Sequence, residues 1–407
     1  MKKLIILISL LGHHAIFAIP DNLESELAGF LDNQTDNALG TDEIHKLSLT
    51  RNKDIQVSYE KYYQAKKSVS VARALINPVT TGYFLGISLG VNYLWTPLIA
   101  NAILSLPTKY YRIEKNKAIK NVKYWNYRHA RKVFANEAVN LYLDIMSNEF
   151  ILKSIELEIS LYKELMNSLI TAEFSNSDRI TEVHKSIKGL QKEYLVISDV
   201  VIKERAALRS LLSYTPDVTL DLAPNAGFLN LINRGYSDQE LEAIALKNSD
   251  KYNSYYWKYH ASLKNLKMVK WSLISLNGLN FSYKQRIRIA NTEKRVALSE
   301  MNSMRKKVQI SATDALERVS NALLVQKAKE QKSFDSLDFN AGMRTNYENG
   351  QLSLNNYVMT AIDAIRDYRH SVVSHYRTLA MVENLEVALG KDLEIDDNGI
   401  LNITDLK

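Results

Sequence analysis

The chain has 407 residues, of which 46% are hydrophobic and 24% are charged, and its formal net charge is +7. Its 14 Gly and 6 Pro are well below average usage, which indicates long uninterrupted helices and excludes a loop-rich fold. It has no Cys, which excludes a lipoprotein attachment site and a disulfide framework. The mild basicity decides nothing alone, because solvated helix faces produce it as readily as a nucleic-acid site does.

Residues 1–18 have the pattern of a secretory signal peptide. Two lysines precede an apolar run over residues 4–11, and small or aliphatic residues lead up to Ala18. The run is too short for a membrane-spanning helix. We therefore expect cleavage after Ala18, with an uncleaved N-terminal anchor as the alternative. A polar segment over residues 19–40 follows.

The remainder is predicted to contain two tandem repeats, each with a helix, a hairpin, a long helix, a short break and a further helix. The stretches that begin at Thr41 and Ser237 align without gaps and share Asp, Asn, Tyr and Ala at matched positions. The predicted order is a first repeat over 41–214, a linker over 215–236, a second repeat over 237–390 and a C-terminal tail over 391–407. The helices expected in the first repeat cover 41–77, about 109–172, and the stretch from the break at 173–179 to about 214.

The long helices have coiled-coil periodicity. Apolar residues step by four and three through residues 141–169 and again through 354–389, with few polar interruptions. A sustained period of 3.5 residues makes helices pack along their length. Residues 109–172 would span about 96 Å at roughly 1.5 Å per residue, which describes a rod. The predicted fold class is therefore mainly α, with long antiparallel coiled-coil helices.

Residues 79–107 contain no charged side chain, and a β-hairpin is predicted at about 83–106. In its first strand, apolar or aromatic residues alternate with mostly small or polar ones, so the two faces have different surroundings. The face expected to contact lipid consists of Tyr83, Leu85, Ile87, Leu89, Val91, Tyr93 and Trp95. The strand's length and aromatic ends fit a membrane-spanning β-strand, which needs about 9–11 residues. A transmembrane helix and a soluble amphipathic hairpin are the alternatives.

A second hairpin is predicted at about 268–289, where Asn277-Gly278 is a two-residue turn signal. Its second strand alternates, and its inner face is expected to place Lys284, Arg286 and Arg288 in a lumen. Its first strand is short and alternates poorly, so the alternative is a hairpin that does not reach the membrane. Two hairpins cannot close a barrel, and lipid permits no open sheet edge, so several chains must share one barrel. A trimer would supply twelve strands.

These features together resemble the TolC-like outer-membrane efflux protein family. The most specific stretch is 347–390, where Tyr347 and Gly350 stand in a Tyr-x-x-Gly turn, Tyr376 lies near the middle of a helix, and the helix ends in Ala-Leu-Gly390. The resemblance implies a homotrimer with a twelve-stranded barrel in the outer membrane and a helical tunnel through the periplasm of a Gram-negative bacterium. It implies a passive exit duct of a tripartite efflux pump or a type I secretion system. The implied partners are a periplasmic adaptor (a membrane fusion protein), an inner-membrane transporter and outer-membrane lipid.

The resemblance also implies two sets of functional residues at the periplasmic end. The tips expected to contact the adaptor contain Asn176, Ser177, Asp178, Tyr347 and Gly350. The aperture is expected at Asn356 and Met359, which stand where TolC carries two aspartates, with Asp363 one turn further along. A polar and thioether constriction therefore replaces an acidic one. The alternative function is a periplasmic coiled-coil interaction protein of the same family without a functional pore.

Catalytic and cofactor chemistry find no support in the sequence. It contains no Gly-rich phosphate loop, nucleophile elbow or paired catalytic acids, so we expect no enzyme and no cofactor. His370 and His375 are five residues apart and lie on different helix faces, which argues against a metal site. Residues 109–132 carry nine Lys or Arg and one Glu among aromatic residues. For an exported chain this segment is expected near lipid headgroups, along the upper tunnel or on a solvated face, and nucleic acid is not an expected partner.

Overall fold

A computed structural model describes residues 38–74, 105–171, 177–215, 220–224, 229–233, 236–273, 282–391, 393, 395 and 399–403. The predicted signal peptide, the seven residues of the predicted lipid-facing strand and Asn176 lie outside these residues. The described part is mainly α-helical, as the periodicity predicts.

Eight helices and two short strands make up the described part of the chain. The first four helices are α3 (Thr41–Arg51), α4 (Lys53–Ala74), α7 (Leu106–Thr171) and α8 (Ser177–Leu211). The next four are α9 (Asp238–Asn248), α10 (Asp250–Trp271), α11 (Tyr283–Glu348) and α12 (Leu354–Leu389). The lengths of the two series match closely, with 11, 22, 66 and 35 residues in the first and 11, 22, 66 and 36 in the second.

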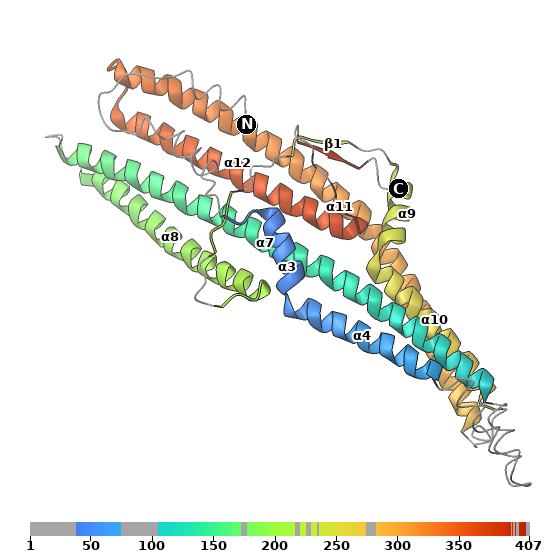
Figure 1. The fold of residues 1–407 in the computed structure, drawn as a ribbon. Helices are drawn as coiled ribbons and strands as arrows, with labels where there is room; N and C mark the ends of the chain where they lie inside the picture. Colours follow the sequence, from blue (N-terminus) through green and yellow to red (C-terminus); the bar gives the residue numbers. More distant parts are fainter. Residues whose placement is uncertain are drawn as a thin grey trace, which may run out of the picture.

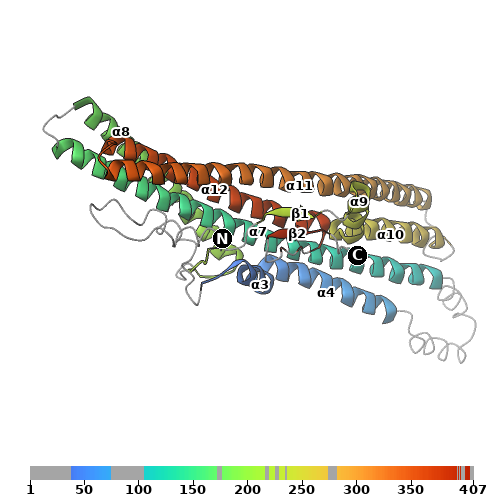
Figure 2. The same ribbon diagram turned by 90° about the horizontal axis from the view of Figure 1, so that it is seen from above.

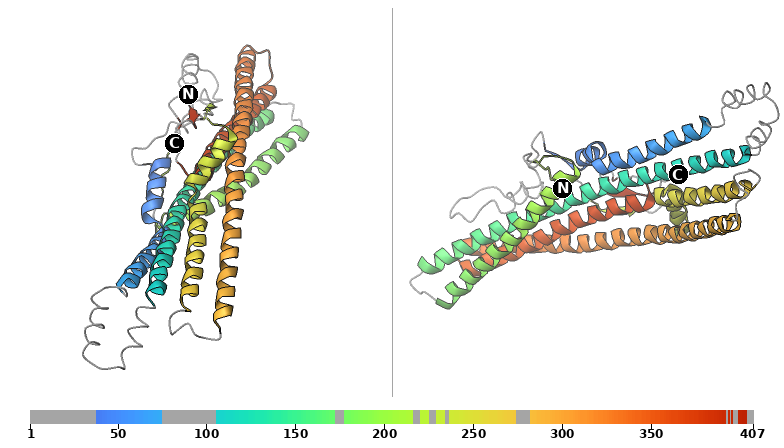
Figure 3. Two further views of the ribbon diagram at one scale, coloured as in Figure 1. Left: turned by 90° about the vertical axis from the view of Figure 1, so that its right-hand side faces the viewer. Right: turned by 90° about the horizontal axis from the view of Figure 1, so that it is seen from below.

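The helices lie side by side in a single layer, and α7 and α11 run through both halves of it (Figure 1). At 66 residues each, these two helices are about 99 Å long. In one half the packing order across the layer is α8, α7, α12 and α11. In the other half it is α4, α7, α10 and α11, which Figure 3 shows in a row. One edge of the layer is therefore formed by α8 in one half and by α4 in the other, whereas α11 forms the opposite edge in both halves.

The core follows the predicted periodicity. Ile145, Ile155 and Tyr162 of α7 are buried, as are Val358 and Ile365 of α12, at the positions that step by four and three. The central helix α7 buries a broader face than a single stripe, because it packs between two neighbours. The additional buried residues include Tyr142, Leu143, Met146, Phe150, Leu161 and Leu165.

The predicted helix over 41–77 is divided at Asn52, which is 3% exposed. Its side-chain oxygen accepts hydrogen bonds from the backbone N–H groups of Asp54 and Ile55, at 2.9 and 3.1 Å. Its amide nitrogen donates to the carbonyl of Leu211 at 3.1 Å. Asn52 is therefore the N-cap of α4, and it also links the boundary between α3 and α4 to the end of α8 by a hydrogen bond. Ser249 begins α10 in the same way, by accepting from the N–H of Tyr252 at 3.1 Å.

Short pieces of chain cover the layer near its middle (Figure 2). The strand β1 (Leu231–Asn233) from the predicted linker pairs in parallel with β2 (Ile400–Asn402) from the predicted tail, in the register Leu231 to Ile400. The linker also supplies Leu220 and Leu222 to the main core cluster. The tail is thus paired with the linker, which the sequence did not indicate.

The prediction of a second hairpin over 268–289 is wrong at both of its ends. Helix α10 continues through Trp271 and α11 begins at Tyr283, which leaves only 274–281 outside the described residues. Ile287 and Ala290 are three residues apart and pack against Leu266 and Val269 of α10, so helical spacing brings both to one face, where strand alternation would place them on opposite faces. The predicted inner-face residues Lys284, Arg286 and Arg288 instead lie exposed on the first turns of α11.

Candidate functional site

The turn between α11 and α12 lies at the end of the layer and is fixed by its backbone. The N–H of Gly350 donates to the carbonyl of Tyr347 at 2.9 Å, and the N–H of Gln351 donates to that of Asn346 at 2.8 Å. This pair of bonds is a Schellman motif, which requires a left-handed residue after the helix, and Gly350 has φ of +72°. The Tyr-x-x-Gly pattern is therefore the C-terminal cap of α11.

Side chains on both sides of this turn hold the two helices together. The rings of Tyr347 and Tyr357 are stacked, with centroids 5.3 Å apart and an interplanar angle of 8°. Ser353 caps α12 by accepting from the N–H of Asn356 at 3.4 Å. One turn later, the hydroxyl of Thr360 donates to the side-chain oxygen of Asn340 on α11 at 3.3 Å. The tip is a packed and hydrogen-bonded corner.

The predicted aperture residues share one exposed face of α12. Asn356, Met359 and Asp363 are exposed and stand three and four residues apart, which places them in one stripe along the helix. The opposite face carries Val358 and Ile362, both fully buried. His370, seven residues after Asp363, is also exposed and continues the stripe, although no sequence pattern assigned it to the aperture. Partial desolvation lowers the pKa of His370, although the residue is exposed as a whole, and the positive charges of Arg369 and Lys329 lower it further.

The other predicted tip is described only in part. Asp178 lies exposed in the first turn of α8, where the positive end of the helix dipole stabilises a carboxylate. Ser177 is the first residue of α8, and α7 ends at Thr171. This end of α7 and α8 lies at the same end of the molecule as the turn between α11 and α12 (Figure 1).

A buried ionic cluster joins α12 to α7. Glu158 of α7 has no exposed surface, and its oxygens lie 2.9 Å from Nε of Arg366 and 2.6 Å from a guanidinium nitrogen of Arg369. Burial raises the pKa of Glu158, against the opposing attraction of Arg369 and then Arg366. Burial alone would lower the pKa of Arg366, but Glu158 raises it. At the carboxyl group desolvation is the larger effect, because Glu158 is enclosed while Arg366 is partly exposed.

A second ionic contact joins α12 to α11. The carboxylate of Asp367 accepts from Lys332 at 2.7 Å and from the hydroxyl of Ser336 at 2.6 Å. These bonds lower the pKa of Asp367 despite the opposing effect of burial. The charged residues in this part of α12 therefore bind the helix to α7 on one side and to α11 on the other. Glu158 was missed because its partners are distant in sequence and because Glu156 stands in the same apolar stretch, so no local pattern distinguishes the buried Glu from the exposed one.

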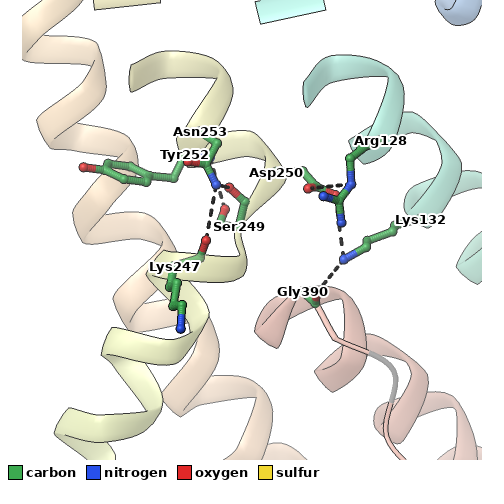
Figure 4. Close-up of polar contacts among 8 residues, drawn as sticks. All are labelled: Arg128, Lys132, Lys247, Ser249, Asp250, Tyr252, Asn253 and Gly390. Carbon is green, nitrogen blue, oxygen red and sulfur yellow. Dashed lines mark hydrogen bonds and ion pairs between the residues drawn. The ribbon is translucent and has the colours of Figure 1, made fainter. Parts of the chain in front are cut away.

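A third cluster lies at mid-length, where α9 meets α10, α7 and the end of α12 (Figure 4). The buried carboxylate of Asp250 lies 3.4 Å from Nε of Arg128 and 3.7 Å from Nζ of Lys132. Burial raises the pKa of Asp250, against Lys132 and Arg128. Lys132 also donates to the carbonyl of Gly390, which ends α12 with φ of +70°. A Cβ atom on Gly390 would lie 2.6 Å from the carbonyl oxygen of Asn248, so α9 approaches too closely for any side chain.

A metal-ion cluster and a membrane-spanning helix are both absent from the described residues. No group of three or more His, Cys, Asp or Glu side chains there is arranged to hold a metal ion. None of the helices in this part of the chain combines the length and apolar character needed to cross a membrane.

The sequence matches no family model, and no curated protein matches it significantly. Solved structures match the fold along most of the chain. The CmeC outer membrane channel of Campylobacter jejuni aligns with a TM-score of 0.68 and 10% identity, over 94% of this chain and 93% of that chain. The open-state MtrE outer membrane channel of Neisseria gonorrhoeae aligns at 0.66 and 11% identity, over 86% and 89%. The outer membrane protein VceC of Vibrio cholerae aligns at 0.64 and 10% identity, over 86% and 96%. The chain has the TolC-like fold of outer membrane efflux channels.

Proposed function

We propose that this protein is an outer-membrane exit duct, which serves a tripartite efflux pump or a type I secretion system as a passive conduit. The observation that carries the proposal is that the helix ends next to the two predicted hairpins and the tip turn after α11 lie at opposite ends of the molecule. The helix ends at Ala74, Leu106, Trp271 and Tyr283, which flank the uncharged segment and the Asn-Gly segment, lie together at one end (Figure 1). The end of α7, the start of α8 and the turn after α11 lie at the other end. One end then enters the outer membrane, and the other reaches through the periplasm.

The proposed topology has two tandem repeats, for which the matched helix lengths are the main support. A segment of 31 residues separates Ala74 from Leu106 in the first repeat, whereas 11 residues separate Trp271 from Tyr283 in the second. We retain the lipid-facing strand over 83–95 as part of this proposal. The second repeat has room for only a shorter connection, so the first hairpin supplies most of the proposed membrane surface.

The proposed assembly is a homotrimer, and the exposed edges of the layer support it. Helix α8 at one edge exposes Leu195, Val196, Val200 and Ile202, and α11 at the other edge exposes Leu324, Val325, Phe334 and Phe339. Large apolar side chains in such number favour a partner surface over water. Contact between the α8 edge of one copy and the α11 edge of the next is heterologous, and repetition of that contact closes a ring. The enclosed space would be the duct.

The proposed roles of the two tips follow from the same arrangement. The turn at Tyr347 and Gly350, together with Asn176, Ser177 and Asp178, would contact a periplasmic adaptor that links the duct to an inner-membrane transporter. The exposed stripe of Asn356, Met359 and Asp363 would line the aperture, because the opposite face of α12 is occupied by the core. No step in this function requires a catalytic group, since energy would come from the transporter.

Single-channel conductance in a planar lipid bilayer tests the proposal. Purified, detergent-extracted trimers are expected to give discrete conductance steps after insertion. The matched control is the same preparation after heat dissociation into monomers, which should give none. Inserted trimers that never conduct, or a protein recovered only as soluble monomer, would remove the basis for a duct.

A further inference from the structure

A basic groove lies between α4, α7 and α10, in the half of the layer away from the tip turns. Its cavity has a volume of about 470 Å³. Five cationic side chains and one carboxylate line it, which are Lys66, Arg73, Lys117, Lys120, Lys264 and Glu114. On each helix the lining residues recur at intervals of three or four positions, some of them as adjacent pairs, so each helix turns one face toward the groove.

The positive charge of the groove is poorly compensated. Glu114 lies 2.6 Å from Lys117 and 3.9 Å from Lys264, so the single carboxylate is shared by two lysines. Among the described residues, Lys66, Arg73 and Lys120 form no ion pair with a carboxylate. The segment over 75–104 that follows α4 contains no Asp or Glu, so it cannot supply a counter-charge. Cations held together in this way repel one another, and a bound anion would relieve the repulsion.

One wall of the groove is aromatic and apolar. Trp257 and His260 of α10 line it, with ring centroids 5.6 Å apart, and the buried Val69 and Ala118 lie beside them. The groove therefore offers an apolar surface next to its cations. A ligand that carries both a compact multivalent anion and an apolar or flat portion would satisfy both parts.

We propose that this groove binds a phosphate group. Four of its five cations are lysines, whose ammonium groups are compact point charges with three donors each. A phosphate carries more than one negative charge and three acceptor oxygens, so it can accept from several ammonium groups at once. The phosphate could belong to a lipid headgroup or to a free solute. The lining residues lie within about 23 Å of the helix ends that flank the proposed membrane segments, at about 1.5 Å per residue.

The first test is calorimetric titration of the full chain, purified in a neutral detergent, with inorganic pyrophosphate. The variant Lys66→Gln/Lys120→Gln removes two cations that have no ion pair in the described structure, and it is expected to bind at least about tenfold more weakly. The matched control, Lys61→Gln/Lys123→Gln, removes the same charge from the same two helices outside the groove and is expected to bind like the wild type. Equal weakening in both variants, or no binding by the wild type, would overturn the proposal unless the lipid test below is positive.

The second test distinguishes the two sources of phosphate. The protein is reconstituted in nanodiscs of phosphatidylcholine, with or without phosphatidylglycerol, and the retained lipid is identified by native mass spectrometry. Retention of phosphatidylglycerol by the wild type and the control, but not by the groove variant, assigns the site to a lipid headgroup. Pyrophosphate binding without such retention assigns it to a solute, and failure of both tests rejects the site. Binding is measured independently of conductance, so this inference and the duct proposal can fail separately.

Discussion

At the scale of single residues, substitutions at three glycines can distinguish the cost of a left-handed backbone from the cost of a steric overlap. Gly350 and Gly390 both have left-handed backbone, with φ of +72° and +70°, but only Gly390 faces a neighbouring backbone. Gly350→Ala is expected to lower the free energy of unfolding by about 1–2 kcal/mol, the cost of a left-handed alanine. Gly390→Ala should cost about 1–3 kcal/mol more, because its Cβ would overlap the carbonyl of Asn248. Thermal unfolding in detergent would measure both changes.

The control is Gly342→Ala within α11, where an added Cβ meets nothing within 4 Å. This change is expected to stabilise the protein by about 0.5–1 kcal/mol, since alanine favours helix. Equal losses at Gly350 and Gly390 would contradict the close approach of α9 to the end of α12.

Glu158 gives a residue-scale prediction of pH dependence. Its pKa in the folded protein is raised by burial above the unfolded value of about 4.3. The folded state therefore binds this proton more readily than the unfolded state does. The stability that this group contributes is fully present below about pH 4.3 and is lost as pH rises through the raised pKa. As pH falls from neutral, the wild type should gain stability relative to Glu158→Gln.

Comparison of these two proteins by thermal unfolding from pH 7 to pH 4 cancels the titration of all other groups. A stability difference that stays constant over this range would contradict the raised pKa. A wild type that loses stability relative to the variant on acidification would show that the guanidiniums of Arg366 and Arg369 outweigh burial.

At the scale of elements, the exposed stripe of α12 predicts how the aperture responds to cations. It contains one carboxylate, Asp363, while Asn356 and Met359 are neutral. Block of conductance by trivalent cations from the periplasmic side is therefore expected to be weak, because few negative charges would surround the opening. Asp363→Ala should reduce the remaining block, and Asp338→Ala, which removes an exposed carboxylate from α11, should leave it unchanged. Strong block abolished by Asp363→Ala would show that the acidic ring has moved one turn along α12.

The sequence predicted those elements whose signals are local. The period of 3.5 residues identified α7 and α12, and the Tyr-x-x-Gly pattern identified the turn at Gly350. It failed where tertiary contacts decide the outcome. Ile287 and Ile289 alternate as in a strand, but packing of Ile287 against α10 favours helix there. The hydrogen bond from Asn52 to the distant carbonyl of Leu211 and the meeting of three helices at the groove are tertiary contacts, which no local pattern encodes.

At the scale of the whole molecule, a single layer of long helices leaves much apolar surface uncovered. A compact bundle buries its helices on all sides, whereas here each helix packs mainly on its two neighbours in the layer. The ionic clusters at Glu158, Asp367 and Asp250 lie between adjacent helices and fix their relative positions. Within the described residues, large apolar side chains on the outer faces of α8 and α11 stay exposed. Further copies would have to cover them, which makes the oligomer part of the fold.

This arrangement predicts a specific cross-link between copies. Val200 lies as many residues from the start of α8 as Val325 lies from the end of α11, and both helix ends are at the tip end of the molecule. Both side chains are exposed, at 38% and 50%. Because the chain has no native Cys, Val200→Cys/Val325→Cys should form disulfides only between α8 of one copy and α11 of the next. Under oxidising conditions, a denaturing gel should show covalent dimers and trimers and no larger species.

Each single-cysteine variant is the control and should stay monomeric on the gel, since a head-to-tail contact brings no residue against its own copy. A dimer from Val200→Cys alone would indicate a two-fold interface, which cannot enclose a duct by repetition.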